Sequence, residues 1–233
     1  MGLARQQEPS VLVFDVNETL IDIDSLAPLF AEWFGDGRVL REWFGQLVMY
    51  SMAATLAESY VDFFALGQGV LRMLAQIYRV DVTGDDIARL QARMSTMPAH
   101  PEVADALTLL HDNGFRLVTL TNSPHRSGAR TPLENAGLGE LFEQQFSVES
   151  CRTFKPSPSV YRYVCDRLGV APADCMMVAA HAWDTLGAQN VGFSAALITR
   201  PGNSPLPVDG LPRPSLVVSD LSELAERLID GRC

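Results

Sequence analysis

The chain has 233 residues, of which 47% are hydrophobic and 20% charged, and it carries a net charge of −10. This length allows one large domain or a core domain with a small insert, and the composition is ordinary for a globular protein with a buried core. The negative charge argues against a nucleic-acid partner. No stretch approaches the ~18 apolar residues of a membrane span, so we do not expect a membrane partner either.

The cysteines give no sign of a metal site. Cys151, Cys165, Cys175 and Cys233 lack CxxC spacing, and no histidine cluster accompanies them, which argues against structural zinc. The opening segment MGLARQQEPS is too polar for a signal peptide. We therefore expect a cytoplasmic protein with reduced thiols.

The first predicted element is a strand at residues 11–14 (VLVF), a short apolar run typical of a strand buried on both faces of a parallel sheet. Residues 21–97 follow as a helical block, in which large apolar residues recur at helical spacing without any strand-like run. A long crossover is the alternative, but crossovers are normally much shorter. We therefore expect a core of residues 1–20 and 98–233 and an inserted helical cap of residues 21–97.

After this block, helical and strand-like segments alternate. Residues 101–113 open with proline and stop at a glycine, residues 158–169 carry a helical apolar face, and residues 220–229 begin at an aspartate cap. The strand-like runs in this part are RLVTL (116–120), MMVAA (176–180), SAALI (194–198) and SLVV (215–218). This alternation predicts βαβ units and an α/β fold with a doubly wound, Rossmann-like parallel sheet.

Polar side chains follow three of the predicted strands. Asp15 follows the first, Thr121 and Asn122 follow the second, and Asp184 comes shortly after the third, while Lys155 lies in an intervening loop. Ligands bind at the carboxyl ends of the strands in open α/β sheets. A lone aspartate after a strand is most often a helix cap. Two carboxylates, an ammonium and an amide at one edge instead predict a reaction centre.

The segments that carry these residues resemble a known set of motifs. FDVNETL, TLTNSP, KPSPSVY and VAAHAWDTLGA, in this order and spacing, are similar to the four motifs of the haloacid dehalogenase superfamily. AWDTLGA resembles more specifically the 2-haloacid dehalogenase branch. The resemblance covers the chain from residue 11 to about residue 202. It implies a Rossmann-like core with a helical cap over the active site, and a small organic acid as substrate.

The resemblance also implies roles for individual residues. Asp15 would attack the halogen-bearing carbon, expel halide and form an ester that water then hydrolyses. Lys155 would keep Asp15 ionised, and Asp184 would position Lys155 or the water. Thr19 would hydrogen-bond Asp15. Thr121, with nearby backbone N–H groups, would hold the substrate carboxylate.

The chain departs from the family pattern at the expected halide site. An arginine usually follows the cap tryptophan, whereas this chain reads Trp43-Phe44. The remaining donors to a leaving halide would be the Asn122 amide and the Trp43 indole N–H. Arg41, three residues before Phe44 on about the same helical face, is the alternative. We expect Trp43, Phe44 and Asn122 at the substrate.

A second departure lies in the fourth motif. Serine and asparagine are common where this chain has Ala179 and His181. His181 could act as the base for ester hydrolysis, given an ordinary pKa near ~6.5, or could merely fill space. Tyr161 matches the tyrosine of the family's third motif, and we expect it in the same network as a substrate-binding residue, or else packed as a core aromatic.

Three functions remain open. Superfamily phosphatases usually carry a second aspartate two residues after the nucleophile, to protonate an alkoxide leaving group, and this chain has Asn17 there. We therefore expect a hydrolytic dehalogenase of small 2-haloacids that needs no metal or other cofactor. A Mg²⁺-dependent phosphatase and a turnover-deficient relative with a binding role are the alternatives. The sequence does not give the natural substrate, the stereochemical preference or the oligomeric state, and a homodimer is one option.

Overall fold

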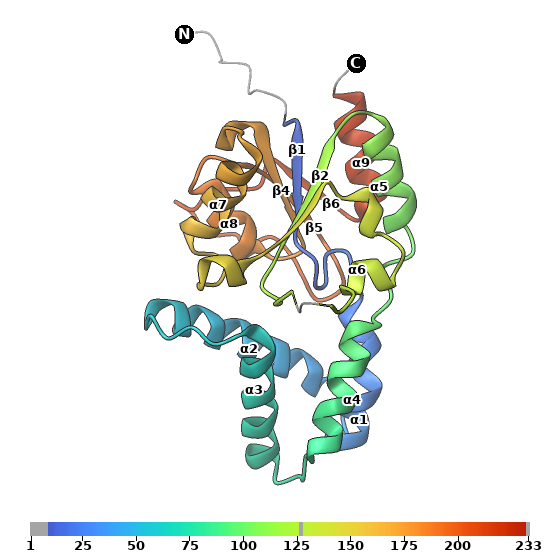
Figure 1. The fold of residues 1–233 in the computed structure, drawn as a ribbon, viewed down its shortest axis with the longest axis vertical. Coiled ribbons are helices and arrows are strands. Elements are labelled where there is room, and N and C mark those ends of the chain that lie inside the picture. Colours follow the sequence, from blue (N-terminus) through green and yellow to red (C-terminus); the bar gives the residue numbers. More distant parts are fainter. Residues whose placement is uncertain (1–8, 126–127, 232–233) are drawn as a thin grey trace.

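The computed structural model describes residues 9–125 and 128–231. Within them, six parallel strands form one sheet in the order β3-β2-β1-β4-β5-β6 (Figure 1). The strands are β1 (Val11–Phe14), β2 (Arg116–Thr121), β3 (Gln144–Ser147), β4 (Cys175–Ala179), β5 (Ser194–Ile198) and β6 (Leu216–Val218). The five predicted strands are confirmed. Strand β3 was missed because its sequence, QQFS, begins with two polar residues that are only half-buried at the edge of the sheet.

Helices cover both faces of the sheet. Helices α7 and α8 lie on one face, and α5 and α9 pack together on the other (Figure 1). Their bounds are α5 (Val103–Asp112), α7 (Pro158–Leu168), α8 (Ala182–Gln189) and α9 (Leu221–Asp230), with the short helix α6 (Pro132–Asn135) and the 3₁₀ turns η2 (Gly139–Leu141), η3 (Val148–Cys151) and η4 (Pro172–Asp174). The predicted cap of the last helix is confirmed, since the Asp220 carboxylate accepts from Glu223 N at 2.9 Å. The α/β doubly wound prediction is likewise confirmed.

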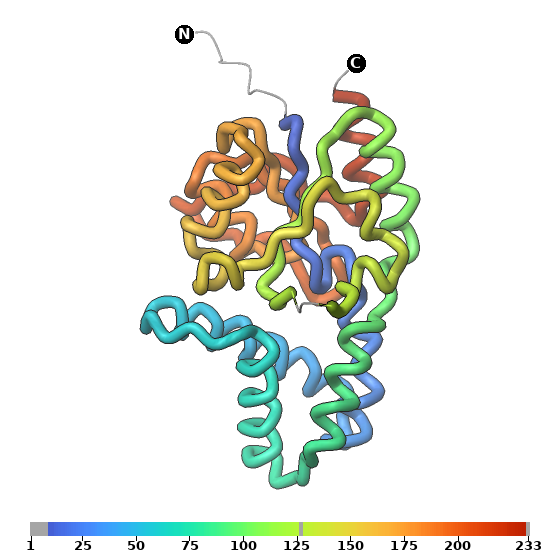
Figure 2. The backbone as a smooth tube through the Cα atoms, viewed as in Figure 1, coloured from blue at the N-terminus to red at the C-terminus, as the bar shows by residue number. Residues whose placement is uncertain are grey.

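Four further helices form a layer of their own beyond the carboxyl edge of the sheet, referred to below as the helical layer (residues 27–95). It consists of α1 (Ala27–Phe34), α2 (Val39–Leu56), α3 (Phe63–Tyr78) and α4 (Gly84–Ser95), and the turn η1 (Ile23–Leu26) precedes it. Figure 2 shows the chain leaving the sheet after β1 and returning just before α5. The two segments that connect the sheet to the helical layer are hydrogen-bonded to each other, because Asp22 N donates to Pro98 O at 2.8 Å and His100 N donates to Leu20 O at 3.0 Å.

The helical layer has an apolar interior. Trp43 is buried there, with its ring centroid 5.4 Å from that of Phe30, and its indole N–H donates to Gly67 O at 2.9 Å. A Cβ at position 67 would lie 3.2 Å from the Trp43 ring, so glycine lets α3 approach this closely. Within the described part of the chain, no helix is long and apolar enough to cross a membrane.

Candidate active site

Asp15 lies directly after β1, near the middle of the sheet, and is 4% exposed. Its carboxylate is held from both sides, because Lys155 Nζ donates to Oδ1 and the Thr19 hydroxyl donates to Oδ2, each at 2.8 Å. Thr19 is itself oriented by a hydrogen bond from Ala180 N at 2.9 Å. The carboxylate therefore has a fixed orientation before any substrate binds.

Lys155 is buried and uses all three of its ammonium protons. Besides Asp15, Nζ donates to Asp184 Oδ2 at 2.6 Å and to Leu120 O at 2.8 Å. The backbone N–H of Lys155 donates to Asn122 Oδ1 at 3.1 Å, which fixes the loop to the end of β2. Burial lowers the pKa of Lys155, but the charges of Asp15 and Asp184 outweigh this and raise it, so the ammonium stays charged.

Asp184, in the first turn of α8, is fully buried. Its Oδ1 accepts the Tyr161 hydroxyl at 2.6 Å, so Tyr161 joins the network. A Cβ at Gly187 would lie 2.7 Å from that hydroxyl oxygen, and the glycine of AWDTLGA therefore lets Tyr161 reach Asp184. Burial raises the pKa of Tyr161 well above its usual value, and the charge of Asp184 adds to this, so the phenol remains a donor.

The environment pushes the two aspartates apart in pKa. Burial alone raises the pKa of Asp15, but the charge of Lys155 and the contact with His181 outweigh it, so the pKa falls well below its usual value. For Asp184, burial raises the pKa, the charge of Asp15 adds to the rise, and Lys155 opposes it only in part. Asp15 is therefore the more acidic of the pair, which suits the nucleophilic role expected of it.

His181 lies between two carboxylates. Its Nδ1 is 3.3 Å from Asp15 Oδ2 and its Nε2 is 2.6 Å from Glu18 Oε2, and Asp15, Glu18 and His181 are all less than a tenth exposed. Its ring stacks on Trp183 at 5.0 Å and packs against Phe44 at 5.8 Å, measured between centroids. Both nitrogens face carboxylate oxygens, so neither is directed at a water molecule. The geometry does not support His181 as a general base.

Arg41 does not take the place of the expected halide-binding arginine. It forms an ion pair with Glu18, and its Nη2 is 2.7 Å from Asp24 Oδ2. Glu18 and His181 thus separate Arg41 from Asp15. The alternative that Arg41 binds the halide is corrected accordingly, because its charge is directed at two acids on the loop after β1.

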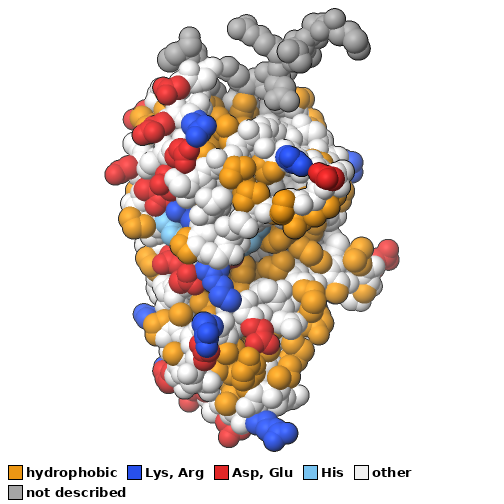
Figure 3. Space-filling view, turned by 180° about the vertical axis from the view of Figure 1, so that it is seen from behind, with side chains coloured by type: hydrophobic (Ala, Val, Ile, Leu, Met, Phe, Trp, Pro, Cys, Tyr) orange, Lys and Arg blue, Asp and Glu red, His pale blue; other side chains and the backbone are white. Residues whose placement is uncertain are grey.

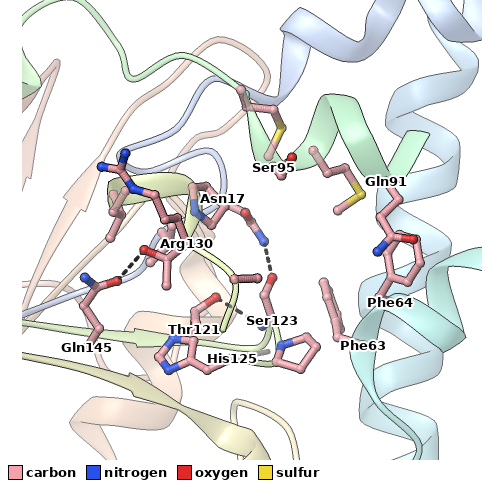
Figure 4. A pocket seen from close by; sticks show the side chains of 18 of the residues that line it. Asn17, Phe63, Phe64, Gln91, Ser95, Thr121, Ser123, His125, Arg130 and Gln145 are labelled. Carbon is pink, nitrogen blue, oxygen red and sulfur yellow. Dashed lines mark hydrogen bonds between the residues drawn. The ribbon is translucent and has the colours of Figure 1, made fainter. Parts of the chain in front are cut away.

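A cavity of about 480 Å³ lies between the carboxyl edge of the sheet and the helical layer. Figure 3, seen from behind, shows hydrophobic side chains gathered around the hollow at mid-height of the molecule, and Figure 4 shows the cavity from close by. Its apolar wall includes Phe63, Phe64, Met94, Met97, Pro132 and Leu133, and its polar residues include Asn17, Gln91, Thr121, Ser123, Arg130 and Gln145. Among the described lining residues, Arg130 is the one lysine or arginine, and none is an acid. An anionic ligand therefore meets no opposing carboxylate on this wall.

The polar end of the cavity lies beside Asp15. Val16 and Asn17, the two residues after it, line the wall, and the Asn17 amide donates to Ser123 Oγ at 3.2 Å. Thr121 also lines the wall, and its hydroxyl oxygen accepts from Ser123 N at 3.1 Å (Figure 4). The cavity therefore runs from the ends of β1 and β2 toward the helical layer.

Four of the five expected substrate-binding residues lie outside the cavity wall. The Trp43 indole N–H is bonded to Gly67, so it is not available to a halide. Tyr161 contacts Asp184, Asn122 holds the backbone of Lys155, and Phe44 packs on His181. The role of these four at the substrate stays a prediction, and of the five Thr121 alone lines the cavity.

Sequence reasoning missed Glu18. It lies inside FDVNETL, three residues after Asp15, but its partner His181 is far along the chain, so spacing alone does not pair them. It also missed Met94, Met97 and Leu133 as parts of the cavity wall, since apolar residues of this kind look like ordinary core. Among the residues described, no cluster of three or more His, Cys, Asp or Glu side chains is arranged to hold a metal ion.

The chain is similar to known proteins over most of its length. Residues 9–192 match the family model described as haloacid dehalogenase-like hydrolase. The chain is 30% identical over 219 residues to (S)-2-haloacid dehalogenase 1 of Pseudomonas sp. (strain CBS-3), which covers 93% of this chain and 95% of that protein. It is 29% identical over 195 residues to (S)-2-haloacid dehalogenase 4A of Burkholderia cepacia, covering 83% and 84%. The solved structure of L-2-haloacid dehalogenase from Xanthobacter autotrophicus with chloropropionic acid covalently bound has a TM-score of 0.85 and 25% identity, covering 97% of this chain and 100% of that one.

Proposed function

Because the chain belongs to the haloacid dehalogenase-like hydrolases, we propose that it is a hydrolytic dehalogenase of small 2-haloacids that works through an ester on Asp15. One observation carries this proposal. The Asp15 carboxylate is kept ionised by Lys155, is held in one orientation by Thr19, and lies beside a largely apolar cavity. The names of the relatives and the covalently bound chloropropionate of the Xanthobacter enzyme support the same reaction.

In the first step, an oxygen of Asp15 attacks carbon 2 of the substrate, and the carbon–halogen bond breaks with its electron pair leaving on the halide. Oδ1 is the better placed oxygen. It has one hydrogen-bonded neighbour, Lys155, whereas Oδ2 faces both Thr19 and His181. A carboxylate oxygen has two in-plane lone pairs, so Oδ1 keeps one of them for the attack.

In the second step, water attacks Cγ of Asp15, and the bond between Cγ and Oδ1 breaks. One proton of the water ends on the hydroxyl of the released 2-hydroxy acid, the other is lost to solvent, and the water oxygen remains in the carboxylate. Lys155, held by Asp184, keeps its charge next to Asp15 throughout. Asp184 in turn is positioned by Tyr161.

We propose that the substrate binds in the cavity. Thr121 and Ser123 offer hydroxyl groups for the substrate carboxylate beside Asp15, and the apolar wall suits the group on carbon 2. Pockets of 300–1,000 Å³ bury drug-sized molecules, so about 480 Å³ exceeds the needs of a two-carbon acid. We propose that residues 21–97 serve as the cap that closes this space, since Phe63 and Met94 of the helical layer line it.

We further place the enzyme in the cytoplasm. Cys151, Cys165 and Cys175, the cysteines of the described part of the chain, are all free thiols. Free thiols suit a reducing compartment.

The function is tested by measuring halide release from a panel of 2-haloacids beside phosphate release from phosphoesters. We expect halide release, and we expect chelation or added Mg²⁺ to leave its rate unchanged, because a halide needs no Lewis acid to leave. Strict dependence on Mg²⁺ together with phosphate release would instead establish the phosphatase alternative.

The role of the cavity is tested by filling it. Ala92→Phe, on the α4 side of the wall, is expected to raise KM for 2-bromohexanoate about tenfold and to change KM for chloroacetate less than about twofold, since each buried methylene contributes about 0.8 kcal/mol. Ala104→Phe, at an exposed position of α5, is the matched control. Equal effects of Ala92→Phe on both acids would show that the cavity does not hold the substrate side chain.

A further inference from the structure

We propose that His181 is a second catalytic residue, a charged imidazolium that donates its Nδ1–H to Oδ2 of Asp15 when negative charge develops there, and that Glu18 is the residue that positions it. This inference rests on the proposed function, because it concerns hydrolysis of the Asp15 ester. It assigns a chemical role to two buried groups that the mechanism above does not use: an acid three residues after the nucleophile and an imidazole at the start of α8.

The contacts of the ring indicate its charge state. Nε2 is 2.6 Å from Glu18 Oε2 and Nδ1 is 3.3 Å from Asp15 Oδ2. A neutral imidazole carries one N–H, so one of these contacts would set a nitrogen lone pair against a carboxylate oxygen. An imidazolium donates to both carboxylates at once.

The surrounding charges favour that state. Around the site, the carboxylates of Asp15, Asp184 and Glu18 face the cations of Lys155, Arg41 and the His181 imidazolium. With a neutral imidazole, Lys155 would face two carboxylates and Arg41 would be shared between Glu18 and Asp24, so negative charge in the site would stay uncompensated, which is costly at buried groups.

Two aromatic rings fix the plane of the imidazole. Trp183 stacks on it with an interplanar angle of 20°, and Phe44 packs against it at 5.8 Å. A cation over an aromatic face is stabilised by the ring quadrupole. Phe44, which stands where a halide-binding arginine is expected, thus has a definite partner in this chain.

Glu18 adopts a backbone conformation that a residue with a side chain rarely takes. Its φ is 65°, in the left-handed region, which is uncommon outside glycine, asparagine and aspartate. The conformation is held by hydrogen bonds from Glu18 N to Ile21 O at 2.9 Å and between Glu18 O and His100 Nε2 at 3.0 Å. Such strain concentrates at functional sites. Here it accompanies a carboxylate that meets His181 on one side and Arg41 on the other.

The chemistry assigns the contact to the second step of the reaction. When Oδ1 is alkylated, Oδ2 remains as the carbonyl oxygen of the ester. Attack of water on Cγ moves the carbonyl electron pair onto Oδ2, where the Thr19 hydroxyl and the His181 N–H both point. These donors strengthen as the charge grows, so they lower the barrier to hydrolysis. In the first step, negative charge leaves Oδ2, and the same donors give no help.

This asymmetry defines the experiment. Wild type, Glu18→Gln and His181→Asn are mixed with excess 2-chloropropionate and quenched, and the ester on Asp15 is measured as added mass on the intact protein. We expect both variants to accumulate ester and to lose about a hundredfold in kcat, with the rate of ester formation within about threefold of wild type. Glu102→Gln, which alters a carboxylate that pairs with Arg200 instead, is the matched control and should accumulate no ester.

A comparison of kcat with KM separates positioning from bulk structure. His181 faces Asp15 after β1, Glu18 on the following loop, and the uncharged rings of Phe44 on α2 and Trp183 on α8, with Arg41 and Lys155 one contact further away. Removing the charge of Glu18 takes away one of the two carboxylates that hold the imidazolium. Because only the second step is slowed, kcat and KM should fall together in Glu18→Gln, and kcat/KM should stay within about threefold of wild type.

A second variant guards against misfolding. In Glu18→Gly the left-handed backbone carries no steric cost, so it should melt no lower than Glu18→Gln while accumulating the same ester. Equal slowing of both steps without ester accumulation would overturn the role of His181 and leave the proposed function intact. A wild-type protein that forms no ester with any 2-haloacid would overturn the proposed function, and this inference with it.

Discussion

Asp15→Asn is expected to lower kcat for halide release by about 10⁴-fold or more, because a neutral amide is a far poorer nucleophile than a carboxylate. The substitution keeps the shape of the side chain, and Lys155 retains Asp184 and Leu120 O as acceptors. The variant should therefore fold, with a cooperative thermal transition like that of wild type. Halide release measured beside this transition separates loss of chemistry from loss of structure.

Isotope labelling distinguishes attack by Asp15 from direct attack by water. In a single turnover in heavy-oxygen water, the label should enter the Asp15 carboxylate, because water attacks Cγ of the ester. The released hydroxy acid should carry unlabelled oxygen taken from Asp15. Label found directly in the hydroxy acid would rule out the ester mechanism, whereas halide release would remain to be explained by an activated water.

Lys155→Met is expected to have the largest effect on stability, lowering the free energy of unfolding at neutral pH by about 3–5 kcal/mol. Lys155 is 1% exposed and binds two buried carboxylates, so its removal leaves Asp15 and Asp184 without their shared cation. Methionine fills a similar volume, which limits the contribution of a cavity. Urea unfolding of both proteins measures the difference, and turnover should be lost as well.

The effect of Lys155→Met on the free energy of unfolding should depend on pH. In wild type, the pKa of Asp15 lies below its ordinary value of 3.8. Asp15 therefore contributes stability above that value and loses it as the pH falls toward the folded pKa. Without Lys155, burial raises the pKa of Asp184 further, and Asp15 loses the charge that lowered its pKa. Both carboxyl groups then bind protons more readily in the folded variant than in the unfolded chain, so the variant loses stability as the pH rises.

The stability penalty of Lys155→Met should accordingly shrink between pH 7 and about pH 4. The double variant Lys155→Met/Asp184→Asn is the matched control, since it removes one of the two uncompensated charges and should recover part of the stability at neutral pH. A penalty that is the same at both pH values would mean that packing, and not charge, accounts for the role of Lys155.

The sequence by itself determined the elements and the main chemical groups of this protein. Short apolar runs such as VLVF are typical of strands buried on both faces of a covered parallel sheet, and the Asp220 cap and the proline and glycine stops mark helix ends locally. Parallel strands bring their carboxyl ends to one edge, so Asp15, Thr121 and Asp184 were expected together. These patterns lie within short segments. They predict the observed elements because they depend on backbone preference and burial, which tertiary contacts do not change.

Tertiary structure alone decided which partner each polar side chain takes. Trp43 was expected at the halide and Arg41 was considered there, yet the first donates to Gly67 and the second pairs with Glu18. Glu18 and His181 are 163 residues apart and meet because β1 and β4 are neighbours in the sheet. A hydrogen bond depends on ångström-level distance and direction, which spacing along the chain does not encode. The sequence therefore determined which groups gather at the edge of the sheet, and the packed fold decided how protons and charges are shared among them.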